Sequence, residues 1–264
     1  MPEGDSIYRV AREVGEVALK RNVVSFTAPR LDPRSCSMVV GQEVSEVSSY
    51  GKHLVIGFSN ALAIHAHMKM TGFWRIYEKE SPSEYRNWRM NAEMVFDSGV
   101  MVRCYRAPIF ELRNRSELRL DLYLGPDLLA PEFDMERLIQ RVREVDQRSE
   151  FSVVLLDQTV AAGIGNIYRC ETLFMRSISP FTPVGELTNE EVKNAYLSAR
   201  SALLSASHSR ASLKIARGQP YVYRRTGESC VVCGSLIRSK YLQSPYATLD
   251  RWVYYCPTCQ PVRR

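Results

Sequence analysis

The spacing of hydrophobic and polar residues changes twice along the chain, and each change predicts a different kind of element. After a short polar start, apolar residues recur every three or four positions from Ile7 to Val17, the period of an amphipathic helix that Asp5 or Ser6 can cap. From 22 to about 129, β-branched and aromatic residues alternate with polar ones between Gly, Pro, Asn and Asp. These runs predict short strands at 23–26, 44–47, 54–58, 61–65, 73–77, 94–96 and 100–105.

Helical spacing takes over in the second half of the chain, with helices expected at 135–145, 151–159, 167–175 and 190–205. The change places a domain boundary near 130–150, and residues 131–134 are the expected hinge. The pattern therefore predicts an α+β fold. A leading helix and an antiparallel β-sandwich or flattened barrel form the N-terminal half, and the C-terminal half is helical.

Length and composition narrow the class of protein. The 264 residues are enough for two domains, and 45% hydrophobic content without a long apolar run predicts a soluble protein that spans no membrane. No signal peptide precedes Pro2, so we expect a cytoplasmic protein, associated with the nucleoid if bacterial, that is not secreted. The net charge of +6 is compatible with binding nucleic acid, although many basic proteins bind none.

Two pairs of cysteines near the C-terminus form the strongest local motif. Each Cys-x-x-Cys pair makes a knuckle, and two knuckles complete a tetrahedral zinc site whose four thiolates leave no open coordination position. The predicted zinc ion is therefore structural, and its ligands are Cys230, Cys233, Cys256 and Cys259. The interval between the pairs is long enough for a β-hairpin that carries Arg251, whose guanidinium can bind a phosphate with two hydrogen bonds. We expect the other thiols, of Cys36, Cys104 and Cys170, to lie in the core.

The first residues can place a reactive amine beside a carboxylate. Removal of Met1 would make Pro2 a secondary amine that is partly unprotonated at neutral pH, and such an amine forms an iminium ion with an aldehyde-level carbon. Glu3 can supply an acid or base, and the positive end of the following helix favours the neutral amine. The alternative is that Pro2 to Asp5 are only a flexible leader before a capped helix.

Two stretches of the strand region carry further polar candidates. Lys52 follows Gly51 and can present its ammonium group to a phosphate, although a solvated lysine at the end of a strand is the simpler reading. His65 and His67 lie on one face of a strand, but no third ligand is close in the sequence. We therefore expect hydrogen-bonded histidines and no metal there.

A Gly-x-Gly-Asn turn interrupts two helices in the second half. Because Gly163 and Gly165 follow a helix and not a strand, this turn is not a dinucleotide-binding fingerprint. The glycines allow a close approach of the backbone, and Asn166 at the start of the next helix can add its amide to N–H groups that point at a phosphate. The alternative is a tight turn with an asparagine cap.

Together these motifs resemble the formamidopyrimidine-DNA glycosylase and endonuclease VIII family. The matching pieces occur in the family's order over essentially the whole chain: Met-Pro-Glu-Gly at the start, Gly51-Lys52, His67 to Gly72, Asp157-Gln158 with Gly163 to Tyr168, and the two cysteine knuckles. The resemblance implies a catalytic β-sandwich at 1–132, a helix-two-turn-helix domain at 133–221 and a zinc finger at 222–264. Damaged double-stranded DNA would bind between the two halves.

By this resemblance the chain is a DNA glycosylase and AP lyase of base-excision repair, a monomer with no nucleotide cofactor. Pro2 would attack C1′, Glu3 would act as the acid, and the iminium would lead to β- and δ-elimination. Lys52, Asn166 and Arg251 would hold phosphates, with Lys52 and Arg251 also counted among the catalytic groups. Met70, with Lys69 beside it, would fill the space that the expelled nucleotide leaves.

Departures from the family pattern bear on the substrate. Residues 107–111 replace an Arg-Phe wedge, so that Phe110 alone remains as a candidate wedge. The chain between Leu204 and Tyr223 is short for the loop that covers oxidised purines. We therefore expect oxidised pyrimidines and the endonuclease VIII branch. The alternatives are an 8-oxoguanine or formamidopyrimidine glycosylase, and a catalytically silent DNA-binding relative.

Two further departures concern secondary contacts, and a third concerns the zinc finger. Ser6 replaces a glutamate common in the family, and Tyr123 stands where endonuclease VIII carries an arginine. Residues 243–250 look inserted, which predicts an enlarged tip of the zinc finger.

Overall fold

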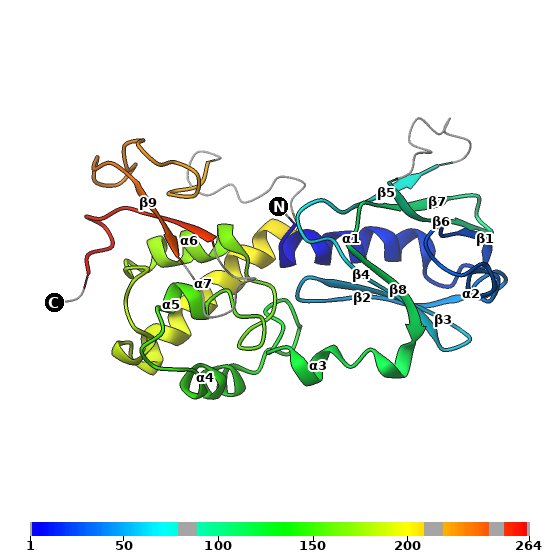
Figure 1. Cartoon of the computed structure of the whole chain (residues 1–264), viewed down its shortest axis with the longest axis horizontal. Helices are drawn as coiled ribbons and strands as arrows, with labels where there is room; N and C mark the ends of the chain where they lie inside the picture. Colours follow the sequence, from blue (N-terminus) through cyan, green and yellow to red (C-terminus); the bar gives the residue numbers. More distant parts are fainter. Residues whose placement is uncertain (1, 79–88, 209–218, 243–250, 263–264) are drawn as a thin grey trace. The chain divides into compact units, whose positions relative to one another are not determined.

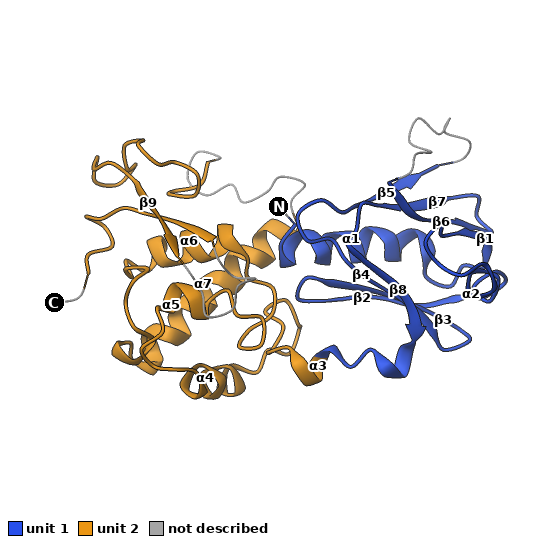
Figure 2. Cartoon of the chain, viewed as in Figure 1, with its two compact units in different colours: residues 1–120 blue, residues 121–264 orange. Residues whose placement is uncertain are grey.

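The computed structural model describes residues 2–78, 89–208, 219–242 and 251–262. The chain divides into two compact units, Met1–Leu120 and Asp121–Arg264 (Figure 2). The division lies ahead of the hinge expected at 131–134, and the three-domain division at 132 and 221 stays a prediction.

Unit 1 contains a leading helix, two short helical segments and two antiparallel four-stranded sheets (Figure 1). Its elements are α1 (Gly4–Ala18), β1 (Val23–Thr27), α2 (Pro33–Ser37), β2 (Val44–Tyr50), β3 (His53–Phe58), β4 (Leu62–His67), β5 (Phe73–Tyr77), β6 (Met90–Phe96), β7 (Met101–Tyr105), β8 (Ile109–Asn114) and η1 (Arg115–Glu117). The strand orders are β1-β6-β7-β5 and β2-β3-β4-β8. The expected leading helix and every expected strand are therefore present.

The core of unit 1 follows from the period-two alternation of its strands. One face of each sheet is apolar, and α1 adds its apolar face to the same cluster. Ile56 and Ile64 point inward from one sheet, Met94 and Val102 from the other, and Val14 from α1. The opposite face of β3 and β4 carries His53, His65 and His67 and is described with the site below.

Strand β8 was not expected from the sequence pattern. Its residues Ile-Phe-Glu-Leu-Arg-Asn do not alternate cleanly, and its partner is set by long-range pairing with β4, where His65 lies opposite Glu111. The short helix α2 was also missed. It begins at Pro33 after Asp32, whose side chain accepts a hydrogen bond from the Ser35 N–H at 3.0 Å.

Unit 2 is helical and ends in a β-hairpin, which confirms the α+β fold class. Its elements are α3 (Leu120–Tyr123), α4 (Met135–Glu144), α5 (Phe151–Val154), α6 (Asn166–Met175), η2 (Val184–Glu186), α7 (Asn189–Ser207), β9 (Arg238–Leu242) and β10 (Arg251–Tyr255). The expectation of one helix over 151–159 is wrong, because α5 ends at Val154. Tight turns follow, in which the Asp157 side chain accepts from the Thr159 N–H at 2.8 Å.

The β-hairpin is packed onto the helices of unit 2 through a shared hydrophobic cluster. Val253 of β10 and Ile237 near β9 are buried against Phe174 of α6 and Val153 of α5. Cys170 of α6 is fully buried in the same cluster, as expected for a core thiol. The hairpin is therefore held by apolar contacts, which include the buried Cys230 and Cys256.

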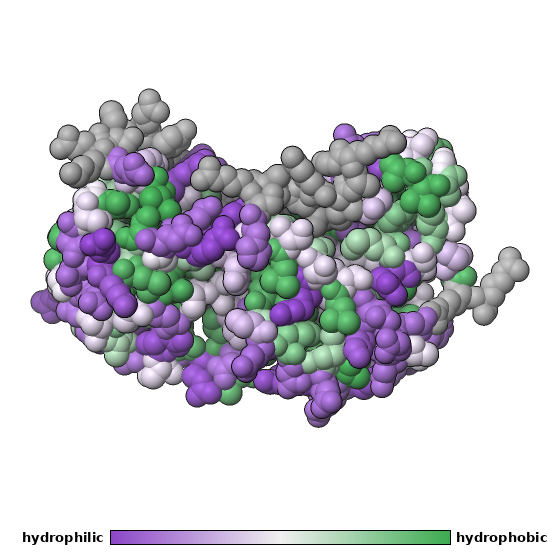
Figure 3. Space-filling view, turned by 180° about the vertical axis from the view of Figure 1, so that it is seen from behind, coloured by the Kyte–Doolittle hydropathy of each residue, from purple (hydrophilic) through white to green (hydrophobic). Residues whose placement is uncertain are grey.

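Hydrophilic side chains cover much of the face drawn in Figure 3, and hydrophobic ones appear between them in small groups. Within the described part of the chain, no helix is both long and apolar enough to cross a membrane.

Candidate functional site

The N-terminal residues are built into the start of α1. Glu3 is the N-cap residue, and only 1% of its surface is exposed. The Glu3 N–H donates to the Ser6 hydroxyl oxygen at 2.9 Å, and the same hydroxyl donates to the Glu3 carbonyl at 2.8 Å. Pro2 is half-buried directly before this cap. Pro2 to Asp5 are therefore not a flexible leader before the helix, because they form its cap and its first turn.

These bonds explain how Ser6 works in place of a glutamate. A side chain at the third position of a helix commonly reaches back to the N-cap N–H in a capping box. Ser6 makes this contact with its hydroxyl group, so the backbone of Glu3 is held without a carboxylate at position 6. Tyr123, the other expected departure, lies at the end of α3 with about half of its surface exposed.

Lys52 lies in the two-residue turn that joins β2 to β3. Tyr50 and His53 are paired across this turn, and Gly51 has a φ of +55°. A glycine at the first position of a two-residue hairpin turn supplies the positive φ that the turn needs. Lys52 is half-buried, and it lies close enough to His53 and His67 for its charge to lower the pKa of both imidazoles.

Met70 lies at the tip of a tightly held turn between β4 and β5. Met68 is buried in the core, whereas 57% of Met70 is exposed. A Cβ atom on Gly72 would lie 2.9 Å from the Met68 Cα, so only glycine allows this close return of the backbone. Lys69 has a φ of +44°, and its N–H donates to the His67 Nδ1 at 3.0 Å. The turn thus presents an apolar side chain on a strained, hydrogen-bonded backbone.

Phe110 lies in β8 and not in a loop. It pairs with Ala66 of β4, is half-buried against the core of unit 1, and has its ring centroid 6.4 Å from that of Trp74. The use of Phe110 as a wedge stays a prediction.

Three histidines gather on one face of β3 and β4. His53 Nδ1 lies 2.8 Å from His65 Nε2, and the His53 and His67 rings meet edge to face with centroids 4.6 Å apart. Burial, aided by the neighbouring histidines and Lys52, lowers the pKa of His53 to about 3. Burial and the charges of Lys52 and Lys69 lower the pKa of His67 to about 4. All three are engaged in polar contacts, as expected for His65 and His67.

In unit 2, Asn166 and Arg251 are linked through the backbone of β10. Asn166 is the first residue of α6, and its side-chain amide donates to the Trp252 carbonyl at 3.0 Å. Buried Arg169 donates to the same carbonyl at 3.1 Å and to the Asn166 side-chain oxygen. Trp252 directly follows Arg251, the half-exposed first residue of β10. The start of α6 and the hairpin therefore form one local structure.

The Gly-x-Gly turn before α6 is organised by Gln158. Its side-chain oxygen accepts from the Gly163 N–H at 3.1 Å, and its amide donates to the Ile164 carbonyl at 3.0 Å. Gly163 has a φ of +116°, which requires glycine. A Cβ atom on Gly125 would overlap the Val160 carbonyl oxygen, so a second segment packs directly against this turn.

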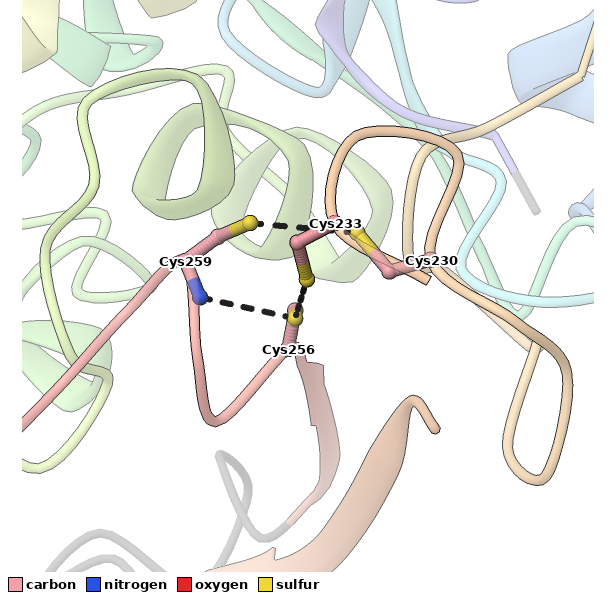
Figure 4. Close-up of side chains that lie close together, drawn as sticks. All are labelled: Cys230, Cys233, Cys256 and Cys259. Carbon is pink, nitrogen blue, oxygen red and sulfur yellow. Dashed lines mark hydrogen bonds between the residues drawn. The ribbon is translucent and has the colours of Figure 1, made fainter. Parts of the chain in front are cut away.

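The four C-terminal cysteines converge (Figure 4). All four sulfur atoms lie within 4.8 Å of one another, with 3.4 Å between Cys233 and Cys256 and 3.9 Å between Cys230 and Cys259. Four thiolates bound to one ion at about 2.3 Å in a tetrahedron would be about 3.8 Å apart. The donor set and its spacing therefore fit one metal ion, and no other such group of His, Cys, Asp or Glu is found among the described residues.

Three contacts that shape the site were not expected from the sequence. Ser6 closes the cap of Glu3, His53 joins the expected pair of histidines, and Gln158 sets the glycine turn. The sequence offered a signal for His53, because this residue directly follows Lys52 at the start of a strand, and that strand pairs with β4. The tip at 243–250 lies outside the described residues, as does most of the segment between Leu204 and Tyr223.

The fold and the site together define a class of two-unit proteins. An antiparallel β unit begins with a structured N-terminal proline, and a helical unit with a four-cysteine finger follows it. Comparison with known proteins agrees. Residues 1–106 match the formamidopyrimidine-DNA glycosylase N-terminal domain, and residues 124–215 match the formamidopyrimidine-DNA glycosylase H2TH domain.

Curated relatives match along nearly the whole chain. A probable endonuclease 8 2 of Streptomyces coelicolor is 32% identical over 98% of this chain and 94% of its own. A DNA-(apurinic or apyrimidinic site) lyase Nei2 of Mycolicibacterium smegmatis is 34% identical over 98% of this chain and 99% of its own. A Lactococcus lactis formamidopyrimidine-DNA glycosylase structure has the same fold, with a TM-score of 0.82 at 23% identity over 99% of this chain and 100% of that one.

The chain therefore belongs to the formamidopyrimidine-DNA glycosylase and endonuclease VIII family. Its class is that of DNA glycosylases with AP lyase activity, and the endonuclease 8 relatives are consistent with the endonuclease VIII branch.

Proposed function

We propose that this protein removes oxidised pyrimidines from double-stranded DNA and cuts the strand at the same site, with Pro2 as the nucleophile. The observation that carries the proposal is the capped N-terminus, in which buried Glu3 is held at the start of α1 directly behind Pro2. The amine and the carboxyl group come from consecutive residues, and the backbone of Glu3 is tied to Ser6. The nucleophile requires removal of Met1, because the nitrogen of Pro2 is otherwise an amide.

The chemistry begins when the Pro2 nitrogen attacks C1′ of the damaged nucleotide. The C1′–base bond breaks, Glu3 serves as the acid, and opening of the sugar gives an iminium between Pro2 and C1′. The fixed positive charge acidifies the C2′ proton. Its loss drives the electron pair toward C3′ and expels the 3′ phosphate, and a second elimination expels the 5′ phosphate. Water then hydrolyses the adduct and returns the Pro2 amine.

Phosphate contacts hold the DNA in this proposal. Lys52 on its hairpin turn, the N-terminal end of α6 at Asn166, and Arg251 at the start of β10 would each bind a phosphate, and Lys52 would also move protons. The hydrogen bond of Asn166 to the Trp252 carbonyl keeps its amide beside the strand that carries Arg251. We assign Arg251 a catalytic role through that phosphate.

Met70 is the proposed residue that replaces the expelled nucleotide in the stack. Its exposure at the tip of a strained turn suits an apolar wedge, and Lys69 beside it can approach the backbone. Expelling the nucleotide costs a few kcal/mol, less for a damaged pair. A rigid turn supports this role because the backbone around Met70 loses little conformational entropy when the side chain inserts.

The four cysteines are proposed to bind one structural zinc ion. Zinc favours four thiolates in a tetrahedron, and a site closed by four protein ligands would hold the hairpin without taking part in the reaction. Cys230 and Cys233 come from one knuckle and Cys256 and Cys259 from the other, so one ion would tie both ends of the finger together. We expect no nucleotide cofactor and a monomeric enzyme.

Borohydride trapping tests the nucleophile. The unmodified protein should become covalently linked to DNA with an abasic site, because borohydride reduces an iminium to a stable amine. Pro2→Gly should trap far less and lose both activities, since a primary amine lacks the fixed geometry of the ring. A protein that binds damaged DNA but never traps would instead be a catalytically silent relative, and trapping that moved to Lys52 would refute Pro2.

Glu3→Gln separates the two reactions. The amide keeps the size of the side chain but cannot donate a carboxylic proton, so base excision should collapse while cleavage of a preformed abasic site largely survives. Binding should persist in the Pro2 and Glu3 variants, because phosphate contacts supply most of the affinity. Equal loss of both activities in Glu3→Gln would contradict the assignment of Glu3.

A panel of defined lesions tests the substrate class. Thymine glycol or dihydrouracil should be excised faster than 8-oxoguanine, as the short segment between Leu204 and Tyr223 and the missing arginine wedge predict. The relatives named endonuclease 8 are consistent with this choice. Faster excision of 8-oxoguanine opposite cytosine would favour the alternative, an 8-oxoguanine or formamidopyrimidine glycosylase.

A further inference from the structure

The histidine cluster of unit 1 is connected to both turns that carry the proposed DNA contacts. His53 directly follows Lys52, and His67 directly precedes the turn that presents Met70. The two histidines lie opposite each other across β3 and β4. His65 lies diagonally beside His53 on the same face, and Glu111 of β8 pairs with His65. Four polar side chains thus form a row across three strands.

The charge states along the row begin with the carboxylate of Glu111. Glu111 Oε2 lies 3.6 Å from His65 Nδ1 and also accepts from Arg113 Nε at 2.8 Å. Arg113 lowers the pKa of Glu111, so the carboxylate is charged at neutral pH. Burial lowers the pKa of His65 despite Glu111, so this imidazole is neutral. A neutral imidazole has one N–H and one lone pair.

The carboxylate of Glu111 then decides the tautomers of His65 and His53. If His65 carried its proton on Nε2, the lone pair of its Nδ1 would face the negative charge of Glu111, which is unfavourable. With the proton on Nδ1, His65 Nε2 becomes an acceptor, and the 2.8 Å contact requires His53 to donate from its Nδ1. His53 is left with a lone pair on Nε2. His67 Nδ1 accepts the Lys69 N–H, so its own proton is on Nε2.

We propose that Glu111, His65 and His53 form a hydrogen-bonded relay of set tautomers that positions Lys52, and that His67 ties the Met70 turn to the same relay. His53, His65 and Glu111 are positioning residues, because they act through Lys52 and not on the DNA. The inference deepens and rests on the proposed function, in which Lys52 contacts DNA and moves protons. The polar face of β3, β4 and β8 would then position Lys52 in addition to stabilising the sheet.

The first test reads the tautomers directly. The chain has four histidines, so nitrogen-15 spectra of selectively labelled protein are simple to assign with single His→Asn variants. At neutral pH, His53 and His65 should be protonated on Nδ1 and His67 on Nε2. Glu111→Gln should allow the opposite tautomer of His65, because an amide can donate as well as accept. A proton on His65 Nε2 in the unmodified protein would overturn the relay.

The second test measures single-turnover elimination at a preformed abasic site. His53→Leu and Glu111→Gln should slow elimination by about tenfold or more, as expected when a reacting group is misplaced by a fraction of an ångström. The dissociation constant for DNA with an uncleavable abasic analogue should stay unchanged. His53→Asn should restore most of the rate, since its amide N–H lies where Nδ1–H was. Glu117→Gln removes the same charge from an exposed position in unit 1 and is the matched control.

The outcomes separate the relay from the function on which it rests. If the unmodified enzyme eliminates and is trapped while His53→Leu and Glu111→Gln match its rate, the relay is wrong and the proposed function stands. If rate, affinity and thermal stability fall together and His53→Asn rescues none of them, the cluster is structural and the relay is again wrong. Absence of elimination in the unmodified enzyme would remove the proposed function and the relay with it.

Discussion

Glu171 offers a direct test of how unit 2 holds the chain that leads into the finger. The side chain lies on α6 with none of its surface exposed. One carboxylate oxygen accepts from the Val222 and Tyr223 N–H groups at 3.0 and 2.9 Å, and the other accepts from the Tyr221 N–H at 2.7 Å. Burial raises the pKa of Glu171, while the three N–H groups oppose that shift. One carboxylate thus accepts hydrogen bonds from all three backbone N–H groups of the segment 221–223.

Glu171→Gln is the sharpest perturbation because it changes one atom's hydrogen-bonding character. The amide oxygen can still accept from two N–H groups, but the amide nitrogen then faces the N–H of Tyr221, donor against donor. Loss of one hydrogen bond to a charged group, with a buried N–H left unpaired, costs about 1.5–3 kcal/mol. Glu171→Ala removes all three acceptors and should cost more.

Urea unfolding measures this difference in the free energy of unfolding. Replacing Trp74 and Trp88 with phenylalanine leaves Trp252 as the sole tryptophan, which reports on unit 2. Glu136→Gln, at an exposed position of α4, is the control and should change stability by no more than about 0.5 kcal/mol. If Glu171→Gln also changed the free energy of unfolding by less than about 0.5 kcal/mol, the three hydrogen bonds would not hold the segment 221–223 as described.

Three further predictions follow from other parts of the molecule. Chelation of the zinc proposed at the four cysteines should abolish DNA binding and leave unit 1 folded by circular dichroism, since the ion would hold the hairpin that carries Arg251; unchanged affinity would contradict this. Unit 1 should lose stability as pH falls from about 6.5 to 4, because the unfolded chain takes up protons that the folded state, with the pKa of His53 lowered to about 3 and that of His67 to about 4, does not. His53→Asn should flatten that pH dependence in urea titrations. Gly125→Ala should destabilise unit 2 by about 2 kcal/mol or more, because its Cβ would meet the Val160 carbonyl oxygen; a neutral thermal melt would contradict this close approach.

Local sequence carried much of the information about the elements and the metal cluster. The helix at Gly4–Ala18 follows from its apolar period, although its N-cap is Glu3 and not Asp5 or Ser6 as expected. The strands other than β8 follow from the β-branched and aromatic runs along each one. The cysteine cluster follows from two short spacings, because each knuckle is made by neighbours in the chain. The family could likewise be named from motifs in order, and the comparisons confirm it.

Tertiary structure decided what depends on partners far away in the chain. Strand β8 exists because β4 accepts it as a neighbour, and this pairing brings Glu111 to His65. Lys52 and His67 are close because β3 and β4 pair in one register, and a shift by one residue would turn His67 to the other face. The hydrogen bond from Asn166 to the carbonyl of Trp252 joins residues that are more than eighty positions apart. Sequence patterns report a residue's own periodicity and caps, whereas pairing register and burial arise from the packing of the whole unit.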